Sequence, residues 1–460
     1  MPVETQERIE LGAGLKDIAV DVVDRAMKAG ATAADAIARD GNEFSTLVRL
    51  GEVETLKESG ARALGLRLFV GKRAAATHTS DFSPEGVEQL VSSAIALARA
   101  TSEDPDGGLP EAGLLGSLSE DLDLYYDDVY SLSTSDRIDY ARRAEAAAMA
   151  IDPRITNSEG GSFDAATGYK VLANSLGFVG EYRRSYCSVS AVPIAQAEGS
   201  AMQRDYWYSA SRTMQKLESP ESVGRKAAER TLRRLGARKV ATQKAPVIFD
   251  PMVSRALIDH IFDAINGDAI YRHASYLAGK LGEQVAGENI TIIDDGTMTG
   301  GFGSSPFDGE GVPTRRTVVI ERGVLKSYLL NTYTARKLKL QTTGNAARGL
   351  TGNPGIGSGN FFLQPGNKTP QEIIADVKSG LYVTEFLGFG VNLVTGDFSR
   401  GASGLWIENG EFVFPVEEIT VAGNLNEMFR NVSVIGNDLE FRSSIAAPTL
   451  RIDGMTVAGE

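Results

Sequence analysis

The sequence predicts an α+β protein in which a duplicated helix–antiparallel sheet–helix N-terminal domain precedes a mostly antiparallel, β-rich C-terminal domain. Three observations carry this prediction. Helical and strand-like patterns follow one another in the same order twice before residue 240. A Ser-Pro-Glu-x-Val helix start occurs once in each copy. Strand and turn signals dominate the remainder of the chain. The predicted domains are residues 1–240 and 241–460.

The first predicted copy spans residues 15–100. It begins with a helix whose apolar residues recur at helical spacing and which stops before Gly30. Glycines then punctuate five short predicted strands, namely Ala33–Arg39, Phe44–Leu50, Val53–Ser59, Ala63–Val70 and Arg73–Thr79. A second helix begins at Ser83-Pro84-Glu85, where Ser83 is the expected N-cap and Pro84 takes the first helical position.

The second predicted copy spans residues 135–236 and repeats this order. A helix over Ser135–Ile151 is followed by strand-like segments at Arg154–Ser158, Phe163–Ala173, Phe178–Val192 and Ile194–Ser209. Ser219-Pro220-Glu221 then opens the closing helix, and Val223 stands where Val87 stood in the first copy. This correspondence predicts an internal duplication, with a chance recurrence of a good N-cap as the alternative.

The C-terminal half carries its own start and stop signals. Pro251–Ile265 has a helical pattern. Hairpins are predicted around Glu321-Arg322-Gly323, between Arg316–Ile320 and Val324–Leu330, and around Asn409-Gly410, between Leu405–Ile407 and Phe412–Phe414. A capping box at Thr369 to Glu372 opens a helix expected to stop at Gly380, and Asn424 caps a short helix through Phe429.

Composition excludes several broad classes of protein. Apolar residues make up 42% and charged residues 23% of the 460 residues, as in globular proteins with sizeable cores. The formal net charge is 47 − 60 = −13, which opposes binding to a phosphate backbone. One cysteine, Cys187, is typical of a reducing compartment. Met1–Leu11 lacks a signal-peptide pattern, and no run of about 18 apolar residues occurs. We therefore expect a cytoplasmic protein that binds neither nucleic acid nor membranes.

Zinc chemistry has few candidate ligands in this chain. Its three histidines are His78, His260 and His273, whereas a zinc hydrolase needs converging nitrogen or thiolate ligands and a carboxylate. His260 lies beside Asp259 and three residues before Asp263, so a mixed carboxylate–imidazole site can be drawn on one helix face. A solvated polar face is the plainer interpretation. No His-Glu-x-x-His sequence occurs.

Other common active-site patterns fail on their context. Gly355-Ile356-Gly357-Ser358-Gly359 precedes strand-like residues where a dinucleotide fingerprint requires a helix. No Gly-x-Ser-x-Gly precedes a helix, and Cys187 lies in an alternating strand pattern. The basic helix Arg225–Arg238 is interpreted as a solvated face because the net charge is negative. Local chemistry alone predicts no active site.

A series of short motifs nevertheless resembles a known family. These motifs are Ile293-Asp294-Asp295-Gly296-Thr297, Phe307-Asp308-Gly309-Glu310-Gly311-Val312-Pro313-Thr314, Glu321-Arg322-Gly323-Val324-Leu325, Tyr333-Thr334-Ala335-Arg336-Lys337, Thr343-Gly344-Asn345-Ala346-Ala347-Arg348, Gly436-Asn437-Asp438-Leu439 and the tail from Ala447-Pro448-Thr449-Leu450 to Val457-Ala458-Gly459. Each is modest alone, but their order and spacing resemble the TldD/PmbA family of metallopeptidases. With the layout of the N-terminal half, the resemblance covers nearly the whole chain.

The resemblance also indicates which branch of the family fits. In the catalytic branch, TldD, a helix carries His-Glu-x-x-x-His and a cysteine near the C-terminus completes the zinc site. Counted back from Gly282-Glu283, that motif falls on Ile258, Asp259 and Asp263. A register starting at His260 fails as well, and no cysteine occurs from Val432 to Glu460. The chain is therefore similar to the TldE/PmbA branch, with no catalytic residue and no metal site of its own.

From the resemblance we expect a heterodimer with a TldD-type subunit that holds the zinc, and a homodimer when the chain is alone. The expected substrates are unfolded or extended peptides, including precursors of peptide antibiotics, held as an added strand by the glycine- and strand-rich C-terminal domain. Two alternatives stay open. One is a stand-alone binding or regulatory protein that modulates a gyrase or a toxin system, and the other is a metal-independent hydrolase that uses Asp308 and Glu310.

Four polar residues in glycine-rich loops are the candidate substrate-cleft residues, and turn chemistry explains them equally well. They are Asp308, Glu310, Asn345 and Arg348.

Overall fold

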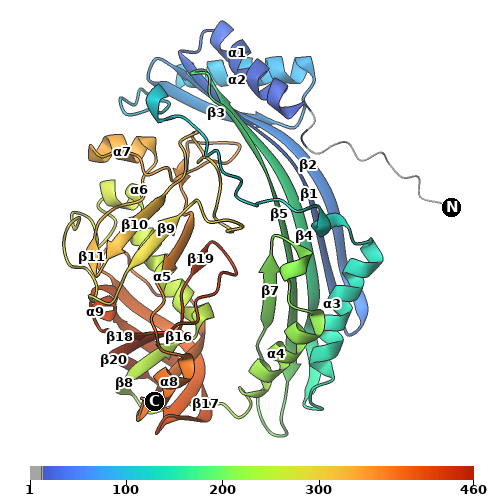
Figure 1. The fold of residues 1–460 in the computed structure, drawn as a ribbon, viewed down its shortest axis with the longest axis vertical. Coiled ribbons are helices and arrows are strands. Elements are labelled where there is room, and N and C mark those ends of the chain that lie inside the picture. Colours follow the sequence, from blue (N-terminus) through green and yellow to red (C-terminus); the bar gives the residue numbers. More distant parts are fainter. Residues whose placement is uncertain (1–11, 13, 460) are drawn as a thin grey trace, which may run out of the picture.

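The computed structural model describes residue 12 and residues 14–459. The expectation about Met1–Leu11 therefore lies outside the described residues, as does Glu460 at the predicted end of the second domain. The α+β class is confirmed, since helices cover one face of a large antiparallel sheet and a second, β-rich part contains further, mostly antiparallel sheets (Figure 1).

One seven-stranded sheet dominates the N-terminal half. Its order is β3-β2-β1-β4-β5-β6, β7 also pairs with β5, and all these pairs are antiparallel. The strands are β1 (Ala33–Arg49), β2 (Glu52–Val70), β3 (Arg73–Thr79), β4 (Ile155–Asn174), β5 (Val179–Ala195), β6 (Gln203–Arg204) and β7 (Trp207–Ser211). β3 pairs only with Leu64–Val70 of β2, so the outer edge of β2 from Glu52 to Ala63 has no partner strand among the described residues.

The prediction of many short strands in this half is wrong. Gly41 and Gly60 do not end strands, because each lies within a continuous ladder in which Gly41 pairs with Ala61 and Asn42 with Gly60. Two of the three predicted breaks within the second copy, at residues 159–162 and at residue 193, likewise fall inside β4 and β5, whereas the break between Ala173 and Phe178 is the turn that joins these strands. A glycine permits a turn but does not require one, and long cross-strand pairing on both sides keeps these segments extended.

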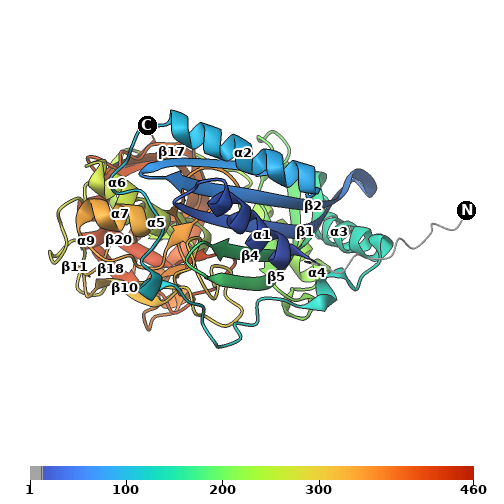
Figure 2. The ribbon, with the colours of Figure 1, turned by 90° about the horizontal axis from the view of Figure 1, so that it is seen from above.

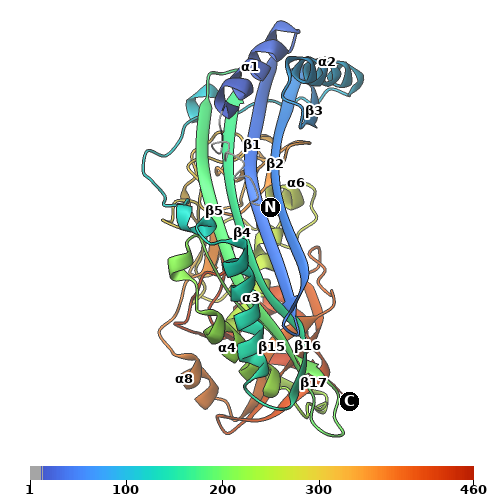
Figure 3. The same cartoon turned by 90° about the vertical axis from the view of Figure 1, so that its right-hand side faces the viewer.

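Four helices cover one face of this sheet (Figures 2 and 3). They are α1 (Leu15–Lys28), α2 (Pro84–Ala100), α3 (Thr134–Met149) and α4 (Pro220–Leu232). α1 and α2 bury an apolar core against one end of the sheet, and α3 and α4 bury a second core at the other end. Both predicted Ser caps form: Ser83 Oγ accepts from the Gly86 N–H at 3.1 Å, and Ser219 Oγ from the Ser222 N–H at 3.2 Å.

The two halves of this part have the same order of elements. Each runs through a helix, two long antiparallel strands, a shorter strand or strands and a closing helix, and β1 and β4 join them at the centre of the sheet. A duplication requires this order. The closer equivalence of residues 15–100 with residues 135–236 stays a prediction, as do the domain boundaries.

Two sheets and one two-stranded ladder make up the C-terminal half. The first has the order β17-β16-β15-β8-β20-β18, and pairing of β17 with β20 closes it into a barrel. The second has the order β11-β10-β9-β14-β19. The strands are β8 (Gln243–Phe249), β9 (Ile292–Asp295), β10 (Arg316–Glu321), β11 (Val324–Leu325), β12 (Ala346–Ala347), β13 (Gly355–Ile356), β14 (Asn360–Leu363), β15 (Ser379–Leu387), β16 (Asp397–Glu408), β17 (Glu411–Asn424), β18 (Val432–Ile435), β19 (Ile445–Ala446) and β20 (Leu450–Ala458).

Helices of the C-terminal half are α5 (Pro251–Ile265), α6 (Gly267–Tyr271), α7 (Thr332–Leu338), α8 (Pro370–Ala375) and α9 (Leu425–Arg430). α5 has the predicted bounds, whereas α8 ends at Ala375 rather than at Gly380. The Asn409-Gly410 hairpin forms with φ values of 51° and 83°. The strand predicted over Val324–Leu330 is shorter, because Lys326 and Ser327 both donate to the Val319 carbonyl and end the ladder.

The face of the large sheet that carries no helices turns toward the C-terminal half (Figure 1). Ile37 and Leu172 on this inner face pack against Phe307. The segment that links the two copies, residues 101–133, crosses the same junction and hydrogen-bonds to its loops, as in the 2.9 Å bond from Gly116 N to Gly311 O. No helix among the described residues is long and apolar enough to cross a lipid bilayer.

Candidate functional site

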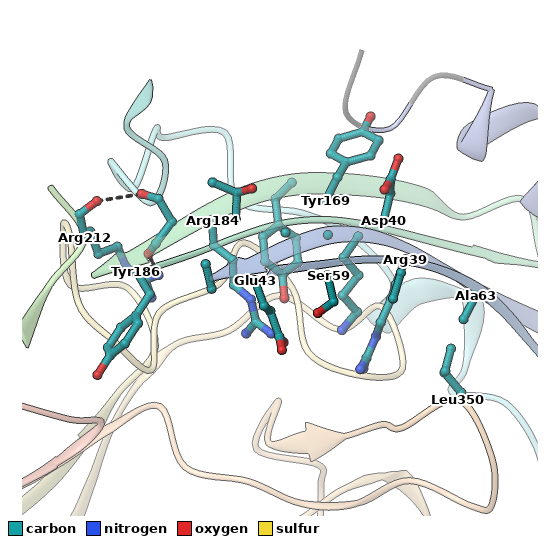
Figure 4. Close-up of a pocket in the computed structure, with 18 of the residues that line it drawn as sticks. Arg39, Asp40, Glu43, Ser59, Ala63, Tyr169, Arg184, Tyr186, Arg212 and Leu350 are labelled. Atoms are coloured by element: carbon teal, nitrogen blue, oxygen red, sulfur yellow. Dashed lines mark hydrogen bonds between the residues drawn. The ribbon is translucent and has the colours of Figure 1, made fainter. Parts of the chain in front are cut away.

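Two adjoining cavities lie between the inner face of the large sheet and the loops of the C-terminal half. Their volumes are about 550 Å³ and 310 Å³, and both are lined by Arg39, Lys170, Tyr182, Arg184 and Phe302. We call the larger the sheet cavity and the smaller the loop cavity. Figure 4 shows the sheet cavity, with the side chains of Arg39 and Arg184 projecting from the strands toward the loops. Concave sites that combine apolar walls with a few polar groups are where ligands bind most often.

The loop cavity is bounded by tightly packed glycine-rich segments. A Cβ atom at Gly303 would lie 2.1 Å from the carbonyl oxygen of Gly359, closer than any real contact, so only glycine allows these two loops to touch. Three of the four predicted cleft residues line this cavity, namely Asp308, Asn345 and Arg348, whereas Glu310 does not. All four side chains are buried.

Asp308 organises the loops instead of presenting a free carboxylate. Its Oδ1 accepts from the N–H groups of Glu310 and Val312, at 2.8 and 3.0 Å, and its Oδ2 accepts from Ala346 N at 2.9 Å. Burial, together with the neighbouring charge of Glu310, raises the pKa of Asp308 to about 7 despite these bonds. The side chain therefore joins two loops and titrates far from the usual range of an aspartate.

Glu310 and Arg348 belong to a buried ion network that joins the two halves of the protein. Arg348 pairs with Asp35 of β1, and Asp35 pairs with Arg67 of β2 at 2.5 Å. Glu310 lies 3.8 Å from the same Arg67 guanidinium and accepts from the Thr332 N–H at 2.9 Å. All four charged side chains are at most 4% exposed. Their contacts favour a structural role, which weakens the case for a hydrolase built on Asp308 and Glu310.

Asn345 holds a second buried carboxylate in place. Its Nδ2 donates to Asp294 Oδ2 at 2.7 Å and to the Gly357 carbonyl at 3.0 Å. Asp294 Oδ1 has no hydrogen-bond partner among the described residues. Burial raises the pKa of Asp294 to about 6, and the bond from Asn345 opposes that shift only in part.

We expect Asp294 to make the protein less stable as the pH rises. A carboxyl group whose pKa is raised by folding contributes stability below its unfolded value of 3.8, and this contribution is lost as the pH passes about 6. The free energy of unfolding of the wild type, measured against that of the non-titrating variant Asp294→Asn, should therefore fall by on the order of 2–3 kcal/mol between pH 4 and pH 7. Urea titrations across this range measure the difference, and parallel curves for the two proteins would contradict the assignment.

The positions on which the sequence analysis places the zinc motif lie elsewhere, on α5. Ile258 is fully buried in the hydrophobic core of the C-terminal half, Asp259 is exposed and Asp263 is half-buried. Burial, together with the charge of Asp259, raises the pKa of Asp263. Among the described residues that line the two cavities, none comes from α5. The structure thus separates the predicted motif positions from the predicted cleft residues.

Metal-ligand chemistry is sparse throughout the described part of the chain, in which no group of three His, Cys, Asp or Glu side chains could hold an ion. Burial raises the pKa of Cys187 on β5 to about 12, so its thiol is a poor nucleophile and a poor ligand. The pKa of His260 is lowered by burial and by the nearby charge of Arg400. Its Nε2 atom has no hydrogen-bond partner among the described residues.

Sequence reasoning missed the basic residues of the inner face. Arg39 and Lys170 are cross-strand partners, Lys170 pairs with Tyr182, and Arg184 lies two residues further along β5. The signal was the period-two spacing of polar residues within each strand, which indicates a common face. Pairing of β1 with β4, across more than 100 residues of chain, could not be predicted from that spacing.

Comparison with known proteins covers almost the whole chain. Models of the PmbA/TldA metallopeptidase family match as domain 1 over residues 34–98, as the central domain over residues 127–235 and as the C-terminal domain over residues 242–459. The metalloprotease PmbA of Escherichia coli O157:H7 is 40% identical over 417 residues, which cover 91% of this chain and 90% of the relative.

Solved structures also resemble this chain over nearly its whole length. A protein from Bacteroides thetaiotaomicron, designated a modulator of DNA gyrase, is 31% identical with a TM-score of 0.90, and the match covers 97% of this chain and 99% of that one. TldE from Thermococcus kodakarensis has a TM-score of 0.86 at 20% identity, and the match covers 96% of this chain and 100% of that one. The second likeness shows a shared fold.

Proposed function

The chain belongs to the TldD/PmbA metallopeptidase family, and from this premise we propose that it is the zinc-less subunit of a two-subunit peptidase that acts on extended peptides. One observation carries the proposal. The helix positions that would hold the zinc ligands and the base are Ile258, Asp259 and Asp263, and the described residues offer no alternative cluster of ligands. The catalytic zinc then belongs to a TldD-type partner, and this chain has no catalytic residue.

α5 would then contribute to the stability of the protein and not to catalysis. Ile258 packs within the core of the C-terminal half, where an aliphatic side chain adds to stability and a buried, unpaired imidazole would be costly. Asp259 and Asp263 remain on the polar side of the helix, where neither makes an ion pair with a described residue. We further assign the protein to the cytoplasm, because its lone cysteine is typical of a reducing compartment.

Peptide substrate would lie along the two cavities. The short ladder of β12 and β13 stands at the loop cavity, which Ala346, Ala347 and Gly357 help to line. Backbone groups of short strands hold extended peptides with little demand on the peptide's side chains. This chain would contribute the wall of the cleft while the partner contributes the metal.

An exposed apolar loop offers a surface for that partner. At the end of β15 and in the loop that follows it, Leu387, Phe389 and Val394 are 44%, 105% and 57% exposed, and we call these three the 387–394 patch. The segment after α6 contacts this loop, since Tyr276 N donates to Leu393 O at 2.7 Å, and Phe398 at the start of β16 contacts the ring of His260 on α5. Apolar side chains gathered on a surface mark protein contacts. Related subunits can share one such patch in a homodimer and a heterodimer alike.

Peptidase assays with and without a partner test the proposal. The purified chain alone should carry far less than one zinc per chain after dialysis and should not cleave an unfolded protein substrate. Addition of a subunit with the intact His-Glu-x-x-x-His helix should produce activity that chelators abolish. The same subunit with both motif histidines replaced by alanine is the control, and it should restore nothing.

Each other outcome has a definite meaning. About one zinc per isolated chain would contradict the proposal and return attention to Asp259, His260 and Asp263. Metal-independent cleavage by the isolated chain would favour the hydrolase alternative, and no activity with any partner would favour a stand-alone modulator. Loss of activity in a mixed complex that contains Asp259→Ala, with zinc still bound to the partner, would show that this chain supplies a catalytic group.

A further inference from the structure

The floor of the sheet cavity is the part of the inner face whose residues have very small side chains or none. Its base on the inner face is formed by Gly41 of β1 and its cross-strand partners, Gly168 of β4 and Ala61 of β2. Further along the same face, Ile37 and Leu172 carry large side chains that fill the space against Phe307. The hollow therefore follows from small residues at matched positions on three neighbouring strands.

Three cationic side chains stand over this floor. Arg39 and Lys170 are cross-strand partners, and Arg184 is the partner of Gly168 in the next row, so the strand register places all three on the inner face. Figure 4 shows the side chains of Arg39 and Arg184. Other groups of the protein hydrogen-bond to or neutralise these charges only in part. Arg39 Nη2 donates to the Arg348 carbonyl at 2.6 Å, and no carboxylate of a described residue lies within 4.0 Å of any of the three.

A fourth cation, Arg212, closes the cavity beside Phe302. Its guanidinium donates to the carbonyl groups of Ser185, Gly301 and Phe302, at 2.9 to 3.0 Å, while its Nε is buried and has no partner in the part of the chain that the structure describes. The acidic residues that line the sheet cavity are Asp40 and Glu43, and those that line the loop cavity are Asp294 and Asp308. The lining of the sheet cavity therefore has four cations against two acids, although the net charge of the protein is −13.

The shifted pKa values of side chains in the sheet cavity agree with a positive electrostatic potential there. Burial would raise the pKa of Tyr182, yet its pKa is lowered by the charges of Lys170, Arg184 and Arg39. Burial lowers the pKa of Arg39, and the charge of Arg184 lowers it further. A bound anion reduces the repulsion between like charges that are held close together. A desolvated anion also makes strong hydrogen bonds with guanidinium and ammonium groups.

We propose that the sheet cavity binds a carboxylate group of the peptide substrate, through Arg39, Lys170 and Arg184, and so fixes the position of the peptide along the cleft. This assignment rests on the proposed role of the chain as the wall of a peptide cleft. The carboxylate is the peptide's C-terminal group or an aspartate or glutamate side chain. Tyr186 and Phe302, whose ring centroids lie 6.2 Å apart, form an adjoining apolar wall for a neighbouring side chain.

Peptide binding to the purified chain tests the assignment without any partner. Three fluorescein-labelled heptapeptides of otherwise neutral sequence serve as probes: one with a free C-terminal carboxylate, one amidated, and one amidated with a single internal aspartate. Fluorescence anisotropy should show that at least one of the two carboxylate peptides binds about tenfold or more tightly than the neutral amide. Which of the two does so identifies the source of the carboxylate. This preference should shrink as salt is added.

Two variants locate the site. Arg184→Gln removes an exposed cation that makes no hydrogen bond or ion pair with another described residue, and it should reduce the carboxylate preference about tenfold. Gly168→Val keeps every cation but fills the floor, and since a Cβ there would meet only Arg184 at 3.7 Å, it should fold and bind weakly. Arg183→Gln is the matched control, because Arg183 is the adjacent residue on the opposite face of β5 and should leave the preference unchanged.

Several results would overturn the assignment. They are equal binding of all three peptides to the wild type, a full preference in Arg184→Gln, or tighter binding of inorganic phosphate than of the carboxylate peptide. Failure of the proposed function looks different. Carboxylate-dependent binding without peptidase activity in any mixed complex would leave the site in place and remove the peptidase role, and activity without carboxylate preference would do the reverse.

Discussion

Arg348→Met should destabilise the protein by about 3–5 kcal/mol, because it leaves Asp35 and Glu310 buried with one guanidinium between them. The Arg348 side chain is 1% exposed, so water cannot replace the lost partner. Removing one member of a buried ion network costs far more than the network adds to stability, since the remaining charges keep their full desolvation penalty. Urea denaturation followed by tryptophan fluorescence measures the shift.

Three further variants make this prediction specific. Arg316→Met removes an arginine that is 53% exposed and 3.9 Å from Asp295, and it should change stability by less than about 1 kcal/mol. Arg348→Lys keeps the charge but loses the planar fork, so an intermediate loss is expected. Asp35→Asn combined with Arg348→Met should cost less than the sum of the two single changes, because both act on one network. A loss below 1 kcal/mol for Arg348→Met would show that the network does not hold the two halves together.

Phe389→Asp should weaken subunit association about 30-fold or more. Phe389 is the most exposed large apolar side chain described, and a central aromatic residue in an interface commonly contributes 2 kcal/mol or more. An aspartate in its place would be buried unpaired against the partner. Sedimentation velocity over a concentration series measures the homodimer, and titration with a TldD-type subunit measures the heterodimer.

A matched surface variant controls for charge. Leu97→Asp on α2 makes the same change at a side chain that is 50% exposed and lies on the N-terminal half, so it should leave association unchanged. Equal weakening by both variants would indicate a non-specific effect. An unaltered dimer in Phe389→Asp would move the interface away from the 387–394 patch.

Helices and hairpins were predictable from sequence where local chemistry fixes them. α5 has the expected bounds because Asp250 caps it and Pro251 starts it, and the Asn409-Gly410 turn forms because its backbone needs two positive φ angles. The lengths of β1 and β2 were not predictable. Whether Gly41 ends a strand depends on its partners in the sheet, and those partners are far away in the sequence.

The candidate site could be predicted only in part. Asp308, Asn345 and Arg348 do line a cavity, but their carboxylate, amide and guanidinium groups are engaged by the protein itself. Polar residues in a glycine-rich segment can either bind a ligand or hold a loop in place, and only the three-dimensional contacts distinguish these two roles. The sequence did not single out Arg39 and Lys170, because each is one ordinary charged residue in its own strand. Only their pairing across β1 and β4 places two cations side by side.

The unpartnered outer edge of β2 bears on how the protein behaves at high concentration. A long strand with free N–H and C=O groups is a template for sheet growth between molecules, and such growth leads to aggregates. Here the edge carries a dense and mixed set of charges, namely Glu52, Glu54, Lys57, Glu58 and Arg62. A second copy that approached strand to strand would bring these charges into register with its own and would have to strip them of water. These charges therefore oppose strand-to-strand pairing between molecules at this edge in spite of its length.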